Sequence, residues 1–315
     1  MKNIKIIFAG TSFFSEHYLN ALINSSYQII GVITQPDTPS GRGQKITFSP
    51  VKILSQKKNI PLFQPLNLNE EKFQYQLSIL NADMMIVVAY GKILPKKILK
   101  MFPIGCINVH PSLLPRWRGA TPIQSAIMHG DKKTGITIIK MNEKIDTGKI
   151  IHSEICSISP IDTTYTLSLK LIHIGIKSLL KILQNIINET IKTIKQDEKN
   201  CRISYKIYKK EGLLNFHFPA IKLERLIRAF NPWPTCHFKI NEKIIKVWKA
   251  EIIPIHIQNY SIGEIVKLNK QGIQIQTGYQ LLNIKKLQIP GKKIMTSEQI
   301  FISQKNLFKK NMILI

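Results

Sequence analysis

Short apolar runs separated by helical spacing constrain the fold of this chain most. Residues 4–8 form an Ile-rich run that ends at Gly10, and a second run covers residues 29–34. Between them, apolar residues recur at helical spacing from Phe14 to Ile23. Runs that are apolar at every position are typical of parallel strands covered on both faces. The pattern therefore predicts a strand, a helix and a strand of an open α/β fold with right-handed crossovers.

Three further runs extend the predicted sheet. They cover residues 84–90, which end at Gly91, then residues 105–110 and residues 135–141. In open α/β sheets, ligands bind outside the carboxyl ends of the strands. The first turn, residues 9–14, lacks the G-x-G-x-x-G pattern that a dinucleotide needs, so the fold is Rossmann-like without predicting a nicotinamide cofactor.

The pattern divides the chain into two domains joined by a linker. At about 150 residues per domain, 315 residues predict two domains. An amphipathic helix from Leu169 to Leu183 closes the first domain, residues 1–189, and residues 190–208 form a basic, exposed linker. In residues 209–315, one helix precedes short strands punctuated by Asn, Gly and Lys. These strands predict a small closed or half-closed β-barrel, of which the OB-like barrel is one example.

The net charge favours a polyanionic partner. The chain has 45 Lys+Arg against 19 Asp+Glu, a formal net charge of +26. Such a field attracts nucleic acid. However, most of the basic residues are lysines, and a compositional drift toward Lys, Ile and Asn would raise the charge without a selected binding face. The position of the basic residues is therefore more informative than their number.

Cysteine spacing and hydropathy indicate the compartment. The four cysteines lie far apart and show no paired spacing, so we expect reduced thiols and no metal site. No uncharged apolar run reaches the length of a membrane span. We therefore expect a soluble, cytoplasmic protein with no membrane partner, acting as a monomer.

Polar side chains follow the ends of the predicted strands. Asn108 and His110 lie two residues apart, so they project from one face of their strand. The strand over residues 135–141 leads to Asp146, which precedes Thr-Gly in a turn. Each residue alone has a structural explanation, as a satisfied core histidine or as a turn cap. Together, and without an activated Ser or Cys nucleophile, they suit direct attack of an amine on a carbonyl carbon.

The same residues carry a family resemblance. The run Asn108 to Pro115 resembles the signature of the folate-dependent formyltransferases, and Asp146-Thr147-Gly148 matches the later aspartate motif of that family. Further matches point to the branch that acts on an aminoacylated tRNA: Thr34 to Gly43, Arg116 to Gly119, Ala229 to Pro234 and Lys246 to Ala250. The resemblance implies formyl transfer from 10-formyltetrahydrofolate, as co-substrate, to the α-amino group of methionine on initiator tRNA, for translation initiation and without a metal.

The resemblance also implies a role for each site residue. Asn108 and a protonated His110 would stabilise the oxyanion, while Asp146 would favour the charged imidazole and accept the amine proton. The expected folate-binding residues are Ser112, Leu113, Leu114, Pro115, Val88, Ala89, Tyr90 and Gly91. The expected tRNA-binding residues are Arg42, Lys45, Lys206, Lys209 and Lys210.

The first two of these basic residues lie in residues 36–45, which we expect to form a mobile loop rather than a helix or strand. Thr38 and Gln44 depart from the family pattern, because a typical member would carry more positive charge there.

Two alternative functions stay open. A formyltransferase acting on a small amine, such as a glycinamide nucleotide or an amino sugar, would share the polar triplet but would have no use for a basic second domain. An RNA-binding protein that has lost catalysis would have no need to retain all three polar residues.

Overall fold

The computed structural model describes residues 4–40, 43, 45–188, 190–255, 259–304 and 307–314. The chain divides into two compact units. The first comprises Met1–Pro122, Lys133–Ser157 and Ser168–Tyr205, and the second comprises Ile123–Lys132, Ile158–Leu167 and Lys206–Ile315. The second unit thus includes two short segments that interrupt the first unit along the sequence.

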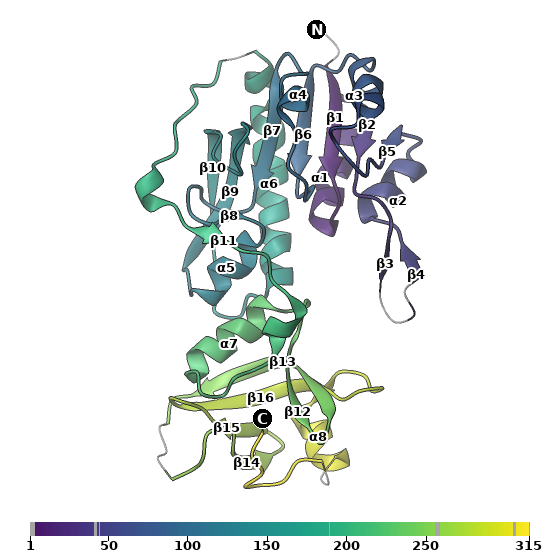
Figure 1. Ribbon diagram of the computed structural model, residues 1–315. Coiled ribbons are helices and arrows are strands. Elements are labelled where there is room, and N and C mark those ends of the chain that lie inside the picture. Colours follow the sequence, from purple (N-terminus) through teal and green to yellow (C-terminus); the bar gives the residue numbers. More distant parts are fainter. Residues whose placement is uncertain are drawn as a thin grey trace. The chain divides into compact units, whose positions relative to one another are not determined.

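The first unit is built on a seven-stranded, mostly parallel sheet, which confirms the predicted fold class (Figure 1). Its order is β10-β9-β7-β6-β1-β2-β5. The strands are β1 (Lys5–Gly10), β2 (Gln28–Ile33), β5 (Leu62–Phe63), β6 (Met84–Val88), β7 (Gly105–His110), β9 (Lys133–Lys140) and β10 (Lys149–Ser157). Neighbouring strands from β5 to β7 run parallel, whereas β9 is antiparallel to both β7 and β10. Each strand predicted from a continuous apolar run is present.

Helices cover both faces of this sheet. They are α1 (Phe13–Ile23), α2 (Pro50–Lys57), α3 (Glu71–Ser78), α4 (Lys96–Leu99) and α6 (Thr164–Ile187), which belongs to this unit from Ser168 onward. On one face, the Tyr18 hydroxyl of α1 donates to the Leu171 carbonyl of α6 at 3.4 Å. On the other face, Phe73 and Leu77 of α3 and Ile98 of α4 join one buried apolar cluster with Ile7 of β1. Both faces of β1 are therefore buried, which explains its unbroken apolar run.

The prediction that residues 36–45 form neither helix nor strand is wrong. β3 (Thr38–Ser40) and β4 (Lys45–Thr47) pair as a two-stranded antiparallel sheet. Beside it, Asp37 accepts hydrogen bonds from the Lys52 ammonium and, at 2.9 Å, from the Gln64 amide. These bonds, that from Lys52 foremost, hold the pKa of Asp37 below its usual value. The predicted tRNA-binding residue Arg42 lies outside the described residues, as does Gln44.

The segment Lys206–Ile315 of the second unit carries an antiparallel sheet and two α-helices, and α5 (Pro122–Met128) belongs to the same unit from Ile123 onward. Its strands are β12 (Cys236–Ile240), β13 (Lys243–Ile253), β14 (Ile265–Asn269), β15 (Gly272–Gln276), β16 (Leu281–Gln288) and β17 (Met295–Thr296). The pairing order is β12-β13-β16-β15-β14, with β17 beside β16. Among the described residues, β12 and β14 end this order without pairing with each other, so the sheet matches the half-closed alternative. The helices are α7 (Ala220–Ala229), which packs on β13, and α8 (Ser297–Ser303).

The connecting segment is more ordered than predicted. It contains two short 3₁₀ turns, η1 (Glu198–Asn200) and η2 (Lys209–Gly212), and the strand β11 (Ile203–Ser204). β11 pairs in parallel with β8 (Arg118–Gly119). Gln196, Ser204 and Ile207 are buried, so the prediction of an exposed segment is wrong at these positions.

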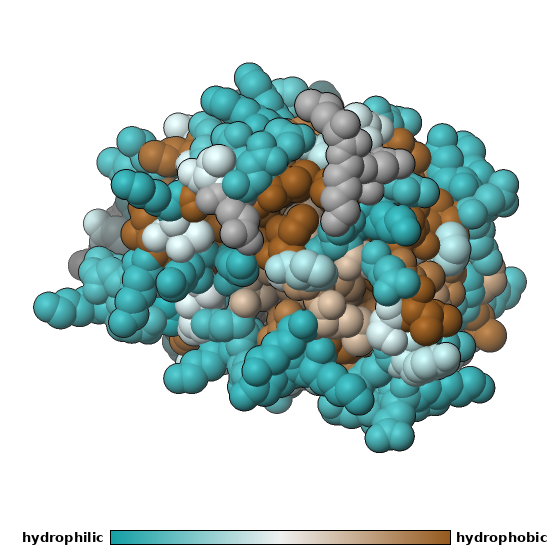
Figure 2. Space-filling model, turned by 90° about the horizontal axis from the view of Figure 1, so that it is seen from above, coloured by the Kyte–Doolittle hydropathy of each residue, from teal (hydrophilic) through white to brown (hydrophobic). Residues whose placement is uncertain are grey.

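The surface agrees with the lysine-rich composition. Figure 2 shows a face that is mostly hydrophilic, with hydrophobic side chains gathered near its centre. None of the helices in the described ranges combines the length and apolarity that a membrane span requires.

Candidate active site

The structure brings Asn108, His110 and Asp146 together at the carboxyl end of β7. The Asn108 side-chain amide donates to Oδ1 of Asp146 at 3.1 Å. Nδ1 of His110 lies 3.5 Å from Oδ2 of the same carboxylate. Because Asn108 and His110 share one face of β7, both reach the turn that follows β9, which is the neighbouring strand. The predicted convergence of an amide, an imidazole and a carboxylate is therefore present.

The His110 ring is buried, with an exposed fraction of 4%. Nε2 lies 2.9 Å from the Trp117 carbonyl, which can only accept, so Nε2 carries a proton in this arrangement. Nδ1 faces the Asp146 carboxylate, another acceptor. A protonated ring satisfies both neighbours at once. The 3.5 Å between Nδ1 and Oδ2 is long for a hydrogen bond. The N–H at Nδ1 is therefore the one that could also donate a hydrogen bond to a further acceptor.

The backbone also holds the Asp146 carboxylate. Asp146 has a φ of +51°, a left-handed conformation that is uncommon for a residue other than glycine. Oδ2 accepts a hydrogen bond from the Gly119 N–H at 2.9 Å. Gly119 has a φ of +112°, and an added Cβ would lie 2.4 Å from the Ser204 carbonyl oxygen. The run Arg116 to Gly119 therefore supplies two main-chain contacts to the triplet, one through Trp117 and one through Gly119, which the sequence pattern did not indicate.

The residues expected to bind folate lie in two segments of the first unit. In the loop after β7, Ser112 and Leu114 are buried while Leu113 and Pro115 are partly exposed. The Thr137 hydroxyl fixes this loop, because it donates to the Ser112 carbonyl at 2.7 Å and accepts from the Leu114 N–H at 3.0 Å. The loop is therefore tied to β9 at two points.

The second segment follows β6, whose carboxyl end lies beside that of β7. Val88 and Tyr90 are buried, and burial raises the pKa of Tyr90 to about 12. Ala89 and Gly91 are exposed, and the Gln35 amide donates to the Tyr90 carbonyl at 2.8 Å. At this strand end a ligand would thus meet Ala89 and Gly91, while the side chains of Val88 and Tyr90 belong to the core.

The lysines expected to contact tRNA are exposed. Lys45 lies on β4 of the first unit, and Lys206, Lys209 and Lys210 begin the last segment of the second unit. The Lys206 ammonium lies 5.8 Å from the centre of the Tyr208 ring. This placement leaves the four cations open to a phosphate backbone. Within the described residues, no three His, Cys, Asp or Glu side chains are grouped so as to hold a metal ion.

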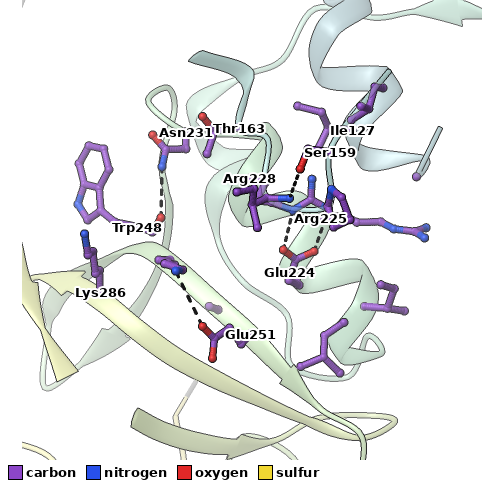
Figure 3. Close-up of a pocket in the computed structure, with 18 of the residues that line it drawn as sticks. Ile127, Ser159, Thr163, Glu224, Arg225, Arg228, Asn231, Trp248, Glu251 and Lys286 are labelled. Carbon is purple, nitrogen blue, oxygen red and sulfur yellow. Dashed lines mark hydrogen bonds and ion pairs between the residues drawn. The ribbon is translucent and has the colours of Figure 1, made fainter. Parts of the chain in front are cut away.

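A separate pocket of about 850 Å³ lies in the second unit (Figure 3). Arg228 on its wall pairs with Glu224, Nε to Oε1 at 2.6 Å, and donates to the Asp162 carbonyl at 3.0 Å. Asn231 donates to the Trp248 carbonyl at 3.2 Å. The lining includes none of Asn108, His110 and Asp146, so this pocket is not the site at the strand ends.

Comparison with known proteins identifies the family. Residues 1–183 match the family described as formyl transferase, and residues 206–305 match the family described as formyl transferase, C-terminal domain. The chain belongs to the formyl transferase family. The signature run Asn108 to Pro115 and the aspartate motif at Asp146 lie within the first match, and the stretches Ala229 to Pro234 and Lys246 to Ala250 lie within the second.

Two curated relatives match this chain over nearly its whole length. A protein of Buchnera aphidicola subsp. Acyrthosiphon pisum (strain Tuc7) named methionyl-tRNA formyltransferase is 64% identical over 314 residues, which is 100% of both chains. A protein of the same name from Buchnera aphidicola subsp. Schizaphis graminum (strain Sg) is 61% identical over 98% of each chain.

A solved formyltransferase shares the fold at lower identity. An N-formyltransferase from Helicobacter canadensis, in complex with folinic acid and dTDP-3-aminofucose, is 21% identical to this chain. The alignment covers 89% of this chain and 99% of that one, with a TM-score of 0.65. The formyl transferase fold thus extends over both units.

Proposed function

We propose that this chain transfers the formyl group of 10-formyltetrahydrofolate to the α-amino group of methionine on initiator tRNA. The observation that carries the proposal is the convergence of Asn108 and His110 on the Asp146 carboxylate. Full-length identity of 64% to a protein named methionyl-tRNA formyltransferase supports this substrate. The N-formyltransferase solved with dTDP-3-aminofucose shares only 21% identity, so the small-amine alternative is not favoured.

The geometry indicates how these residues act. The neutral amine of methionine attacks the formyl carbon, and negative charge develops on the formyl oxygen. The second N–H of the Asn108 amide and the Nδ1 proton of His110 donate to that oxygen. Removing one such donor typically costs about 2.7–4 kcal/mol of transition-state stabilisation. Asp146 stabilises the imidazolium and accepts the proton that the amine loses, either directly or through a water molecule. The bond between the formyl carbon and N10 of the folate then breaks, N10 takes up that proton, and tetrahydrofolate leaves.

The folate site lies beside the triplet, because β6 and β7 end at the same edge of the sheet. Exposed backbone at Ala89 and Gly91 can meet the flat pterin ring. At Gly91 a side chain would collide, since an added Cβ would lie 2.4 Å from the Gln35 amide nitrogen. Across the strand ends, the loop from Ser112 to Pro115 offers apolar contact. The residues present therefore fit the co-substrate, which supplies an activated formyl group.

For tRNA, we propose contacts with Arg42, Lys45, Lys206, Lys209 and Lys210. Catalysis is then the task of the first domain, residues 1–189, while residues 190–208 and the domain of residues 209–315 hold the phosphate backbone. Arginine suits a direct contact with a phosphate or a base edge because its guanidinium can donate two parallel hydrogen bonds. We further propose that the protein is cytoplasmic and that it is a monomer. Sedimentation as a single 36.1 kDa species would check the monomeric state.

Formylation assays test this proposal. The protein is incubated with 10-formyltetrahydrofolate and methionine-charged initiator tRNA, with free methionine and charged elongator tRNA as parallel substrates. We expect rapid formylation of the charged initiator tRNA only, and equal activity on free methionine would contradict the proposed substrate. Tight RNA binding without formylation would instead indicate a binding protein.

Two variants separate the proposed sites. The His110→Ala variant should lose turnover by a factor of roughly 10² to 10³ while retaining tRNA affinity, since one oxyanion donor is removed. The Arg42→Ala variant should chiefly lower kcat/KM for tRNA. Steady-state kinetics together with filter binding measure both effects, and reversed outcomes would show that the two sites are assigned wrongly.

A further inference from the structure

The side chain of Gln196 is buried against the turn that carries Asp146. Its exposed fraction is 5%, although the sequence predicts an exposed segment there. The amide nitrogen donates to the main-chain carbonyls of Asp146 and Gly148, each at 2.8 Å. The amide oxygen accepts from Nε of Arg118 at 3.0 Å and from its Nη2 at 2.8 Å. All four hydrogen-bonding positions of this amide are therefore used.

Arg118 is itself fixed by the connecting segment. Its guanidinium donates to both carboxylate oxygens of Glu198, at 2.8 and 2.9 Å. This bidentate pair raises the pKa of Arg118 and lowers that of Glu198. Arg118 lies on β8, which pairs with β11, and the residue opposite Arg118 is Ile203. Gln196 thus bridges a braced arginine and the Asp146 turn.

The turn requires such a restraint. Asp146 has a φ of +51°, a conformation that costs free energy in a residue with a Cβ and persists only where neighbours enforce it. On one side the turn packs on β9, since an added Cβ at Gly148 would lie 2.0 Å from the Lys140 carbonyl oxygen. On the other side, Gln196 holds the carbonyls of the residues at positions 146 and 148. The direction of the Asp146 carboxylate depends on both.

We infer that Gln196 is a positioning residue of the formyl transfer, which acts by fixing the Asp146 carboxylate against Asn108 and His110. It does so from the connecting segment, which is then part of the active site. The inference rests on the proposed function, because it concerns the geometry of that reaction. It assigns Gln196 no contact with the reacting atoms; its effect on turnover passes through Asp146.

Two substitutions separate its contacts. Gln196→Leu removes all four hydrogen bonds at similar volume, whereas Gln196→Glu keeps acceptors for Arg118 and loses both donors to the turn. A matched control is Gln184→Leu on α6, where an exposed amide donates to Asn188 at 3.1 Å. Both Gln196 variants should lower kcat by roughly tenfold to a hundredfold, because misplacement by about 1 Å is enough for such a loss. KM for charged tRNA and for folate should stay within about twofold, and the control should match the wild type.

The deciding measurement is a double-mutant cycle in single-turnover assays with excess enzyme. If Gln196 acts through Asp146, then Gln196→Leu should cost nothing further in an Asp146→Asn background. An equal loss of rate in both backgrounds would overturn the inference, as would unchanged kcat in both Gln196 variants, whatever their Tm. A wild-type chain that forms no formylmethionyl-tRNA would refute the proposed function itself. An active wild type with fully active Gln196 variants would refute this inference alone.

Discussion

Two threonines on β9 allow a matched test of the loop from Ser112 to Pro115, which forms part of the proposed folate site. Thr137 is 0% exposed, and its hydroxyl bridges the Ser112 carbonyl and the Leu114 N–H. Thr134, three residues earlier, is 2% exposed, and its hydroxyl has no hydrogen-bond partner among the described residues. Substitution by valine replaces the hydroxyl with a methyl group at nearly constant volume in both cases. The two variants therefore differ mainly in the hydrogen bonds that are lost.

The magnitude follows from these contacts. In Thr137→Val, the buried Leu114 N–H loses its partner, which costs about 1–3 kcal/mol. The Ser112 carbonyl loses one donor, and we assign about 1 kcal/mol to that loss because a carbonyl tolerates it better than an N–H. The free energy of unfolding of this variant should therefore fall by about 2–4 kcal/mol. Thr134→Val should raise it by about 1 kcal/mol, because it removes a buried hydroxyl that is unpaired.

Urea unfolding of the full chain, followed by hydrogen exchange of peptides from the first unit, measures this difference. The Leu114 amide should exchange faster in Thr137→Val and at the wild-type rate in Thr134→Val. KM for 10-formyltetrahydrofolate should rise only in Thr137→Val, because the loop from Ser112 to Pro115 loses both anchors. Equal changes in unfolding free energy for the two variants would refute the reasoning.

Three further predictions concern charge and thiol chemistry. Three exposed lysines, Lys206, Lys209 and Lys210, are replaced together by alanine. The slope of log Kd for tRNA against log salt concentration should then fall by up to about 0.9 for each phosphate contact that is lost, as filter binding across a salt series would show. The pKa of Glu198 is lowered in the folded state by Arg118, so its contribution to stability is present above the unfolded-state pKa and is lost as pH falls through the lowered value. The Glu198→Gln variant should therefore lose less Tm than the wild type between about pH 5 and 3, and parallel Tm curves would contradict this. Burial raises the pKa of the Cys106 thiol to about 12, so at pH 8 iodoacetamide should modify Cys106 far more slowly than the partly exposed Cys201, as peptide mapping by mass spectrometry would measure.

The parts of the fold that the sequence predicted are those buried on both sides. β6 is covered on two faces and every position in it is apolar, so the run is visible without context. β7 is buried along most of its length, and its two polar residues, Asn108 and His110, lie in its carboxyl-terminal half. β10 was missed because it lies at the sheet edge, where most of its side chains are partly or fully exposed. β3 and β4 were missed because each has three residues and β3 contains a proline, which usually indicates a turn.

The candidate site divides in the same way. The placement of Asn108 and His110 was predictable because ligands bind at the carboxyl ends of strands in such sheets. The rule does not by itself place Asp146, because β9 runs antiparallel to β7 and ends with Lys140 beside Ile107. The contacts from Trp117, Gly119 and Gln196 were not, because they depend on the pairing of β8 with β11, two strands of two residues each. Such short strands have no periodicity to detect, and nothing local distinguishes a buried glutamine from an exposed one.

The pairing of β8 with β11 has a consequence for exchanging domains between relatives. The two family matches leave residues 184–205 unassigned, yet this stretch packs with the first unit and carries the strand beside the Gly119 N–H. In a chimaera joined directly after residue 183, the Asp146 turn would come from one parent, and the segment that contacts it, which contains Gln196 and β11, would come from the other. A crossover after Tyr205 keeps both halves of that pairing from one parent, but residues 123–132 and 158–167 of the second unit then come from the other parent than residues 206–315, so their contacts must be matched as well.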